Sequence, residues 1–279
     1  MDLGIRGRRA IVCGASRGSG RGCAEALAVE GVELFIAARG VDALEALSVE
    51  LWTRYGARSH IVPCDVTTQE GRAAVLAACP APDILVNNAA GPPGGDFRQF
   101  GPKDWIAAME NNLVAPLELI KATIDGMVER KFGRIVNITS RSVKAPLPHL
   151  PLSNGARAGL TAVVATIARD PKVARANVTV NNLLPGLFDT ELYHKRNAAL
   201  VRQMGKPIED VDRDRLAEIP AGRPGDPKEF GVACAFLCGA HSGYITGQNL
   251  LLDGGATGGA VGARAAATIR VFQEETACR

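Results

Sequence analysis

Short apolar runs alternate with longer amphipathic stretches along most of this chain. The apolar runs predict strands over Ala10–Cys13, Glu33–Ala37, His60–Pro63, Ile84–Asn87, Arg134–Ile138, Val178–Leu184 and Asn249–Leu252. The stretches between them predict helices that include Gly20–Glu30, Ala43–Tyr55, Lys103–Arg130, Arg157–Arg169 and Pro227–Cys238. Strand–helix alternation of this kind is typical of an α/β fold, in which a parallel sheet is covered by helices on both faces.

Two stretches depart from this rhythm. Residues 188–226 are charged, contain Gly and Pro and have no strand pattern. We interpret them as a lid over the carboxyl edge of the sheet, where folds of this class bind ligands. Residues 258–279 follow a Gly- and Ala-rich run and are predicted to form a C-terminal tail.

Composition narrows the class of protein. The 279 residues carry a formal net charge of +3, and 47% of them are hydrophobic, which is the balance of a globular domain rather than a disordered chain. The small charge excess is spread out, so neither a nucleic-acid nor a membrane partner is expected. No apolar run reaches the roughly 18 residues of a membrane span, and no signal-peptide pattern opens the chain. We expect a cytoplasmic protein.

Cysteines and histidines give no sign of a metal site. The seven cysteines contain no CxxC pair, and the four histidines are scattered. Cys234 and Cys238 lie four residues apart on a predicted helix, where a pair of metal ligands is conceivable. Two small core residues are the preferred interpretation, and no metal is expected.

A glycine-rich loop follows the first predicted strand. It reads Cys13-Gly14-Ala15-Ser16-Arg17-Gly18-Ser19-Gly20 and leads into a helix. Glycines there permit a sharp turn and let backbone N–H groups approach a pyrophosphate, which the helix amino terminus also attracts. A plain glycine turn is the alternative, but the strand–loop–helix context favours dinucleotide binding.

The second strand bears on which dinucleotide binds. Sites for NAD usually place an acidic residue after this strand, whereas this chain has Ala37-Ala38-Arg39. A cation at Arg39, together with Arg17, suits the extra 2′-phosphate of NADP(H). Two solvated surface arginines are the alternative. NADP(H) is therefore predicted in preference to NAD(H).

Several further motifs, in order and at matching intervals, resemble those of the short-chain dehydrogenase/reductase family. The glycine loop has that family's GxxxGxG spacing. The other matching residues are Asp65 and Val66 after the third strand, Asn88, Ala89 and Gly91 after the fourth, Asn112 in the next helix, Pro185, Gly186 and Thr190 after the sixth, and Gly247 with Leu252-Asp253-Gly254-Gly255 near the end.

The resemblance implies a fold, an activity and a set of binding residues. Residues 1–257 are expected to form one doubly wound Rossmann-type domain around a seven-stranded parallel sheet. The family reduces carbonyls or oxidises alcohols, and its members are commonly homodimers or homotetramers. By this resemblance the cofactor contacts would be made by Gly14, Ser16, Arg17, Gly18, Ser19, Gly20, Arg39, Asp65, Val66, Asn88, Ala89, Gly91, Arg157, Pro185, Gly186 and Thr190.

The catalytic motif departs from the family pattern. Family members carry a Ser that holds the carbonyl, then a Tyr that transfers the proton and a Lys that lowers the Tyr pKa. Ser140 matches the Ser, and Asn112 matches an active-site Asn. Ser153 stands where the Tyr is expected and Arg157 replaces the Lys. An aliphatic hydroxyl is a much weaker acid than a phenol, so proton transfer must be rebuilt or lost.

Four substitutes for the missing acid are open. His149 lies in the loop between Ser140 and Ser153 and is of the residue type that most often transfers protons, Tyr193 lies in the predicted lid, and Lys144 is near the pocket. A water held by Ser140, Ser153 and Asn112 is the fourth. Each side chain can also be explained without a catalytic role: His149 as an exposed loop residue, Tyr193 as a packing residue of the lid and Lys144 as a solvated surface residue. Ser19, where the family has Ile or Leu, is interpreted as a helix cap.

Two classes of function remain. The preferred hypothesis is an NADP(H)-dependent oxidoreductase of a carbonyl/alcohol pair, with an acyl thioester or a hydrophobic ketone as substrate by family analogy. The rival is a catalytically silent NADP(H)-binding protein that acts as a sensor or oligomer partner. No residue pattern in the sequence indicates non-redox chemistry, such as hydration or elimination, in the same pocket. The substrate pocket is predicted to include Pro92, Pro93, Phe97, Leu147, Phe188 and Leu192.

Overall fold

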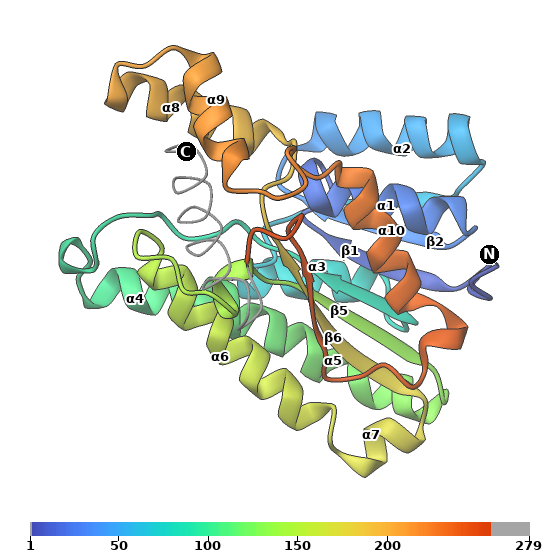
Figure 1. Cartoon of the computed structure of the whole chain (residues 1–279). Coiled ribbons are helices and arrows are strands. Elements are labelled where there is room, and N and C mark those ends of the chain that lie inside the picture. The colour runs from blue at the N-terminus through green and yellow to red at the C-terminus, as the bar shows by residue number, and fades with distance from the viewer. Residues whose placement is uncertain (1, 258–279) are drawn as a thin grey trace, which may run out of the picture.

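The computed structural model describes residues 2–257 and is built on a parallel sheet of seven strands (Figure 1). The strands lie in the order β3-β2-β1-β4-β5-β6-β7. Because the order reverses direction between β1 and β4, the sheet is doubly wound, as predicted. Its strands are β1 (Arg9–Cys13), β2 (Glu33–Ala38), β3 (Ser59–Pro63), β4 (Ile84–Asn87), β5 (Gly133–Ile138), β6 (Val178–Pro185) and β7 (Asn249–Leu252).

A hydrophobic cluster covers each face of the sheet. One cluster packs the strands against three helices: α1 (Gly18–Val29), α2 (Val41–Tyr55) and α10 (Pro227–Cys238). The other packs them against α3 (Gln69–Ala78), α5 (Ala115–Glu129), α6 (Pro151–Ile167) and α7 (Pro171–Arg175). In Figure 1 the first group lies above the sheet, and α5, α6 and α7 lie below it. Every residue of β4 and β5 is buried, including the polar residues Asn87, Arg134 and Asn137.

The longest predicted helix, Lys103–Arg130, is interrupted. It consists of α4 (Pro102–Met109), the π-helical turn η2 (Glu110–Val114) and α5, which follow one another directly. The π-helical turn contains Asn112, whose side chain is buried. Single π-helical turns inside longer helices are frequent at functional sites. The interruption therefore marks Asn112 as a candidate functional residue.

Helix α6 begins six residues before the predicted start at Arg157. Pro151 occupies its first position, where a missing N–H costs nothing and the fixed φ angle suits a helix. Ser153 and Arg157 consequently lie one turn apart on the same face. Short 3₁₀ turns complete the described chain: η1 (Phe97–Gln99), η3 (Arg141–Val143) and η4 (Ala240–Ser242).

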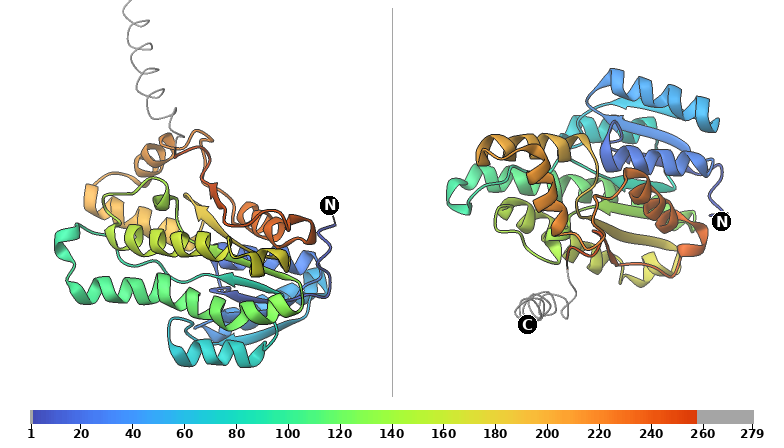
Figure 2. Two further views of the ribbon diagram at one scale, coloured as in Figure 1. Left: turned by 90° about the horizontal axis from the view of Figure 1, so that it is seen from below. Right: turned by 45° about the horizontal axis from the view of Figure 1, so that its top comes forward.

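The predicted lid contains two helices, α8 (Glu191–Met204) and α9 (Ile208–Ala217). Thr190 caps α8 by accepting a hydrogen bond from the Tyr193 N–H, and Gly205 ends the helix with a φ of +64°. In both views of Figure 2 these helices stand at the end of the molecule away from the N-terminus. We call residues 190–217 the α8–α9 segment.

The part of the chain that the structure describes contains no helix long and apolar enough to cross a membrane. Within it, no cluster of three or more His, Cys, Asp and Glu side chains is arranged to hold a metal ion. Cys234 and Cys238 are fully buried in the core, which confirms their interpretation as packing residues. The predicted tail, residues 258–279, lies outside the described residues.

Candidate functional site

The glycine loop connects β1 to α1 at the carboxyl edge of the sheet. Gly14 and Gly18 have φ angles of +60° and +57°. A Cβ atom on Gly20 would lie 2.2 Å from the Gly14 carbonyl oxygen, and one on Gly14 would lie 2.5 Å from Asn88 Nδ2. Larger residues do not fit at these two positions. The tight loop leaves the first turn of α1 open to an anion.

The amino terminus of α1 corrects one prediction. The residue that caps the helix is Arg17, and no side chain accepts a hydrogen bond from the first turn. Ser19 is the second residue of the helix, so its interpretation as the cap was wrong. The reason is that the helix begins at Gly18, two residues earlier than the predicted start at Gly20. The N–H groups of this turn therefore remain available to a phosphate.

Both arginines predicted for the 2′-phosphate face carboxylates. Arg17 Nη1 lies 3.1 Å from Glu191 Oε2 at the start of α8. Arg39 Nη1 lies 3.8 Å from Asp65 Oδ2. Hydrogen bonds from Thr67, reinforced by the charge of Arg39, lower the pKa of Asp65. All four side chains are accessible to solvent, so these ion pairs are weak and can give way to a phosphate.

A pocket opens beside the ends of β4 and β5. Its lining includes Cys13, Val66, Asn87, Asn88, Ala89, Asn111, Asn112, Ala115, Pro116, Leu119, Asn137, Ile138, Arg157 and Leu160. Five of these residues were predicted as site residues from the sequence. They are Val66, Asn88 and Ala89 from the cofactor motifs, together with Asn112 and Arg157 from the catalytic set. The fold therefore brings segments that are almost 100 residues apart into one pocket.

Arg157 is the charged group of this pocket. Its side chain is 9% exposed, and Nη1 donates hydrogen bonds to the main-chain oxygens of Ile138 and Thr139 at the end of β5. Its buried Nε atom has no partner in the described structure. Burial, and secondarily the charge of Arg196, lowers the pKa of Arg157 to about 10.

A second buried arginine provides a contrast. Arg134 is fully buried, and its three guanidinium nitrogens donate to main-chain or side-chain oxygens of Gly133, Asn177, Gly239 and Ala240. Every hydrogen-bonding direction of Arg134 is thus used within the fold. The outer nitrogen Nη2 of Arg157 also makes no hydrogen bond in the described structure, and it lies beside Gly91, where a built Cβ would be 3.5 Å from it. A ligand in the pocket can accept a hydrogen bond from this nitrogen.

Ser140 and Ser153 carry the two hydroxyls of the predicted catalytic set, and neither is among the residues that line the pocket. Ser140 directly follows Thr139, and its Oγ accepts a hydrogen bond of 3.1 Å from the Ser142 N–H. Ser153 is 6% exposed and lies one helical turn before Arg157. The two hydroxyls and the guanidinium therefore gather at the carboxyl end of β5, which is the edge where ligands bind in this fold class.

The segment after β6 lies against the glycine loop. The Gly186 N–H donates to the Leu252 oxygen at 2.8 Å, and a Cβ on Gly186 would lie 2.5 Å from Asp253 Cβ. Thr190 approaches Gly18 closely, since a Cβ built on Gly18 would be 3.5 Å from Thr190 Cγ2. Of the three predicted residues, Thr190 thus approaches the glycine loop, whereas Pro185 and Gly186 lie beside the end of β7.

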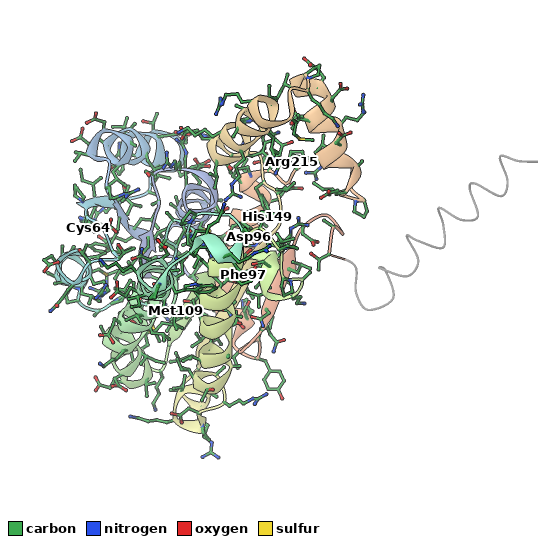
Figure 3. The ribbon with its side chains drawn as sticks, turned by 90° about the vertical axis from the view of Figure 1, so that its left-hand side faces the viewer. Cys64, Asp96, Phe97, Met109, His149 and Arg215 are labelled. Atoms are coloured by element: carbon green, nitrogen blue, oxygen red, sulfur yellow. The ribbon has the colours of Figure 1, made fainter. Side chains whose placement is uncertain are left out.

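The three side chains considered as substitute acids lie in two different settings. His149 and Lys144 are exposed. The main-chain oxygen of His149 accepts from the Gly95 N–H at 2.9 Å, so the two loops meet as Figure 3 shows around His149, Asp96 and Phe97. Tyr193 is buried, and its hydroxyl donates to Asp212 Oδ1 at 3.1 Å. Tyr193 is thus engaged in packing α8 against α9.

Phe188 corrects the predicted pocket wall. It is buried in the core and packs edge-on against Phe230, with ring centroids 5.2 Å apart. The cause is a bridge between Phe188 and Gly225, which ties the start of the α8–α9 segment to the domain and turns the ring inward. Phe97 and Leu192, which the sequence also placed at the pocket, are exposed.

The sequence analysis missed a row of buried asparagines. Hydrogen bonds run from Asn87 Nδ2 to Asn137 Oδ1, from Asn137 Nδ2 to Asn182 Oδ1, and from Asn182 Nδ2 to Asn249 Oδ1, at 2.9, 3.2 and 2.8 Å. The four residues are paired across β4, β5, β6 and β7. An Asn in each of four apolar strands was the available signal. The row holds the strand ends below the pocket in register.

These features fit a dinucleotide. The glycines leave no room for a Cβ where a pyrophosphate approaches, the first turn of α1 is uncapped, and Arg157 has an unpartnered donor. Uncapped N–H groups suit the phosphates, and a guanidinium suits ribose hydroxyls. The residues present therefore fit the cofactor that the sequence predicts.

Comparison with known proteins decides the family. A family model described as enoyl-(acyl carrier protein) reductase matches residues 14–257. The chain belongs to the short-chain dehydrogenase/reductase family. Within this family it is similar to the 3-oxoacyl-(acyl-carrier-protein) reductase FabG of Vibrio cholerae, with 34% identity over 91% of this chain and 98% of the relative.

Two further family members are informative. The NADPH-dependent reductase BacG of Bacillus subtilis is 30% identical over 89% of this chain and 97% of its own length. The structure of L-sorbose reductase from Gluconobacter frateurii, complexed with NADPH and L-sorbose, superimposes with a TM-score of 0.87. That pair is 30% identical, and the match covers 93% of this chain and all of the reductase. The Rossmann-type fold of short-chain dehydrogenases/reductases is thereby confirmed.

Proposed function

We propose that this protein is an NADP(H)-dependent oxidoreductase that interconverts a carbonyl and an alcohol, with Ser153 and Arg157 in place of the usual Tyr and Lys. The observation that carries the proposal is Arg157, a buried guanidinium with an unpartnered donor in the pocket beside Asn112. A chain that had lost its cofactor would have little reason to keep such a charge in the interior, since burying it is costly.

The preference for NADP(H) rests on two cations and on the relatives. Arg17 and Arg39 lie at the glycine loop and after β2, where the adenosine ribose of a dinucleotide binds in this fold. BacG is named an NADPH-dependent reductase, and the L-sorbose reductase structure contains NADPH. Asp65 and Val66 would contact adenine, and Pro185, Gly186 and Thr190 would hold the nicotinamide amide.

When bound, the reduced nicotinamide supplies a hydride to the carbonyl carbon. Ser140 holds and polarises the carbonyl oxygen by donating a hydrogen bond. Arg157 binds the ribose hydroxyls through its free N–H group and contributes positive charge near the developing alkoxide. Ser153 is too weak an acid to replace a phenol, so the proton reaches the alkoxide through a water held by Ser140, Ser153 and Asn112.

The proposed substrate is a small carbonyl or alcohol compound, with a 3-oxoacyl thioester and a hydrophobic ketone as the first candidates. The similarity to FabG supports the thioester and the L-sorbose reductase supports a ketone. We further propose a homodimer or homotetramer assembled through α5 and α6. The apolar residues Leu117, Ile124 and Val128 of α5 line a shallow groove beside α6 and α7, which supports an interface there.

The test is NADPH oxidation by the purified protein with a panel of ketones and acyl thioesters. A Ser153→Tyr/Arg157→Lys double variant is measured in parallel, with Ser140→Ala as the negative control. We expect slow turnover by the parent, faster turnover by the double variant and none by Ser140→Ala. If the parent and the double variant both bind NADPH tightly but neither turns over any substrate, the result would favour a catalytically silent NADP(H)-binding protein. This is the second candidate function, because the aliphatic hydroxyl of Ser153 is a poor acid.

A further inference from the structure

Helices α8 and α9 pack mainly against each other. Tyr193 of α8 and Val211 of α9 are buried, yet neither belongs to the two hydrophobic clusters that cover the sheet. The Tyr193 hydroxyl donates to Asp212 Oδ1, which also accepts from Asn197 Nδ2. Neither helix contacts another described helix or strand as extensively as it contacts its partner, and Figure 1 shows the pair standing out from the body of the domain. The α8–α9 segment is therefore a small packing unit of its own.

Main-chain contacts hold both ends of this unit on the domain. Before α8, the Asp189 N–H donates to the Gly225 oxygen at 2.8 Å, next to the bridge between Phe188 and Gly225. After α9, the Ala221 N–H donates to the Gly254 oxygen at 3.1 Å. Helices fixed at their ends and packed on each other can open locally or shift while the rest of the domain stays folded.

A single ion pair joins the helices of the unit to the rest of the domain. Arg17 Nη1 of the glycine loop lies 3.1 Å from Oε2 of Glu191, the first residue of α8. Among the side chains that the structure describes, no other hydrogen bond or ion pair links residues 191–217 to a residue outside 188–226. Both side chains are more than half exposed, at 65% and 52%, so a competing anion can break the pair. Lys195 also pairs with Glu191, so the carboxylate keeps a partner when Arg17 leaves it.

The 2′-phosphate of NADP(H) is such an anion. By the proposed function it binds to Arg17, and its negative charge would then lie beside the Glu191 carboxylate. A guanidinium binds a phosphate strongly, and the two anions repel each other. NAD(H) has no 2′-phosphate and leaves the ion pair intact. Thr190 would contact the nicotinamide of either cofactor, so the 2′-phosphate alone distinguishes the two complexes at this point.

We propose that the Arg17–Glu191 ion pair is a latch, and that NADP(H), but not NAD(H), opens it and thereby loosens the α8–α9 segment. This inference rests on the proposed function and adds a regulation of the same site, because the segment beside the glycine loop is freed only when the preferred cofactor is bound. The two equilibria are linked: removing the latch must tighten NADPH binding by the factor by which NADPH loosens α8. One exposed ion pair sets that factor at about two- to fivefold.

Hydrogen–deuterium exchange of α8, followed by mass spectrometry, tests the latch without requiring turnover. Local opening of α8 breaks the ion pair, so losing the pair speeds exchange by the factor that the pair contributes. The full-length protein is measured alone, with NADPH and with NADH, each cofactor at a concentration that a fluorescence titration shows to saturate the site. Glu191→Gln is the test variant. Glu209→Gln is the matched control, because Glu209 is an exposed glutamate in the first turn of α9 and its loss has a comparable effect on a helix end.

We expect the amides of residues 192–202 to exchange about two- to fivefold faster in the NADPH complex than in the NADH complex. Without cofactor, Glu191→Gln shows the faster exchange already, and NADPH does not increase it further. Glu209→Gln behaves as the parent in all three states.

Equal exchange of α8 in the two cofactor complexes overturns the inference and leaves the proposed function standing. An unchanged rate in Glu191→Gln without cofactor has the same meaning. Equal acceleration of α8 by Glu209→Gln and Glu191→Gln also overturns the inference, because it assigns the effect to helix ends rather than to the ion pair. Failure of the parent to bind NADPH overturns the proposed function and, with it, the latch.

Discussion

The Arg157 guanidinium donates hydrogen bonds to the main-chain oxygen of Thr139, the residue immediately before Ser140. This contact joins α6 to the end of β5 at the point where Ser140, the residue proposed to bind the carbonyl, begins its turn. A lysine at this position would have a single ammonium to divide between β5 and a ribose. The arginine fork contacts β5 through one nitrogen and leaves others for a ligand.

Replacing Arg157 should weaken NADPH binding without lowering the stability of the fold. We expect Arg157→Met to leave the melting temperature unchanged or to raise it, because it removes a buried charge that has no acidic partner. The same change should weaken NADPH binding about tenfold or more, since the ribose contact is lost. Differential scanning fluorimetry and a fluorescence titration with NADPH measure the two effects. Arg157→Lys, which keeps the charge, should retain most of the affinity; equal loss in both variants would contradict the ribose assignment.

Replacing Arg134 should lower the stability of the fold and leave NADPH affinity unchanged. Its guanidinium satisfies carbonyls of Gly133, Asn177, Gly239 and Ala240. We expect Arg134→Met to destabilise the fold by about 2–4 kcal/mol, because several buried acceptors lose their donor at once. Urea unfolding followed by circular dichroism measures the change. NADPH affinity should be the same as in the parent at temperatures where the variant is folded. A neutral effect on stability would show that water replaces the guanidinium.

Gly20 should be intolerant of any side chain. A Cβ there would lie 2.2 Å from the Gly14 oxygen, so Gly20→Ala must push the loop away from α1. We expect NADPH affinity to fall at least about tenfold, since the N–H groups of the loop lose their alignment toward the phosphates. Gly126→Ala, in the middle of α5, is the control: a Cβ there would approach only the end of the Arg130 side chain, so a change in NADPH affinity within about 0.5 kcal/mol is expected. A titration with NADPH compares the two variants.

The ion pair between Arg17 and Glu191 should compete with the cofactor. The Arg17 guanidinium is 3.1 Å from the Glu191 carboxylate, and a 2′-phosphate would need the same donor. We expect Glu191→Gln to tighten NADPH binding by up to about fivefold, which corresponds to the loss of one exposed ion pair. NADH affinity should change little, because NADH has no 2′-phosphate. Equal tightening for both cofactors would indicate that Glu191 acts on the pyrophosphate instead.

Much of the fold could be predicted from the chain because its patterns are local. The strands Ile84–Asn87 and Asn249–Leu252 were predicted with their observed bounds, since apolar runs between turn residues are distinctive. Helices α8 and α9 were not predicted because their charged composition obscures the few apolar positions, such as Tyr193, that pack between them. The start of α6 was misplaced because Pro151 reads equally as a loop residue and as a helix start.

The residues of the candidate site were likewise predicted only in part. The glycine loop, Asn88 and Asn112 were found by their motifs, because their chemistry depends on a few neighbouring residues. The hydrogen bonds from Arg157 to the main-chain oxygens of Ile138 and Thr139 had no sequence signal, since they join α6 to the end of β5. Phe188 was misassigned for a related reason, because only the bridge to Gly225 turns its ring into the core.

The sequence by itself determined the doubly wound sheet and the tight glycine loop between β1 and α1, and it predicts Ser153 and Arg157 in place of the usual Tyr and Lys. These depend on residue type and spacing along the chain. Tertiary structure alone decided which buried guanidinium groups have all their hydrogen-bond donors satisfied. Arg134 became a fully bonded part of the core, whereas Arg157 kept a free donor at a pocket. The two side chains are chemically identical, and the difference lies in the carbonyls and carboxylates that distant segments bring within hydrogen-bonding distance.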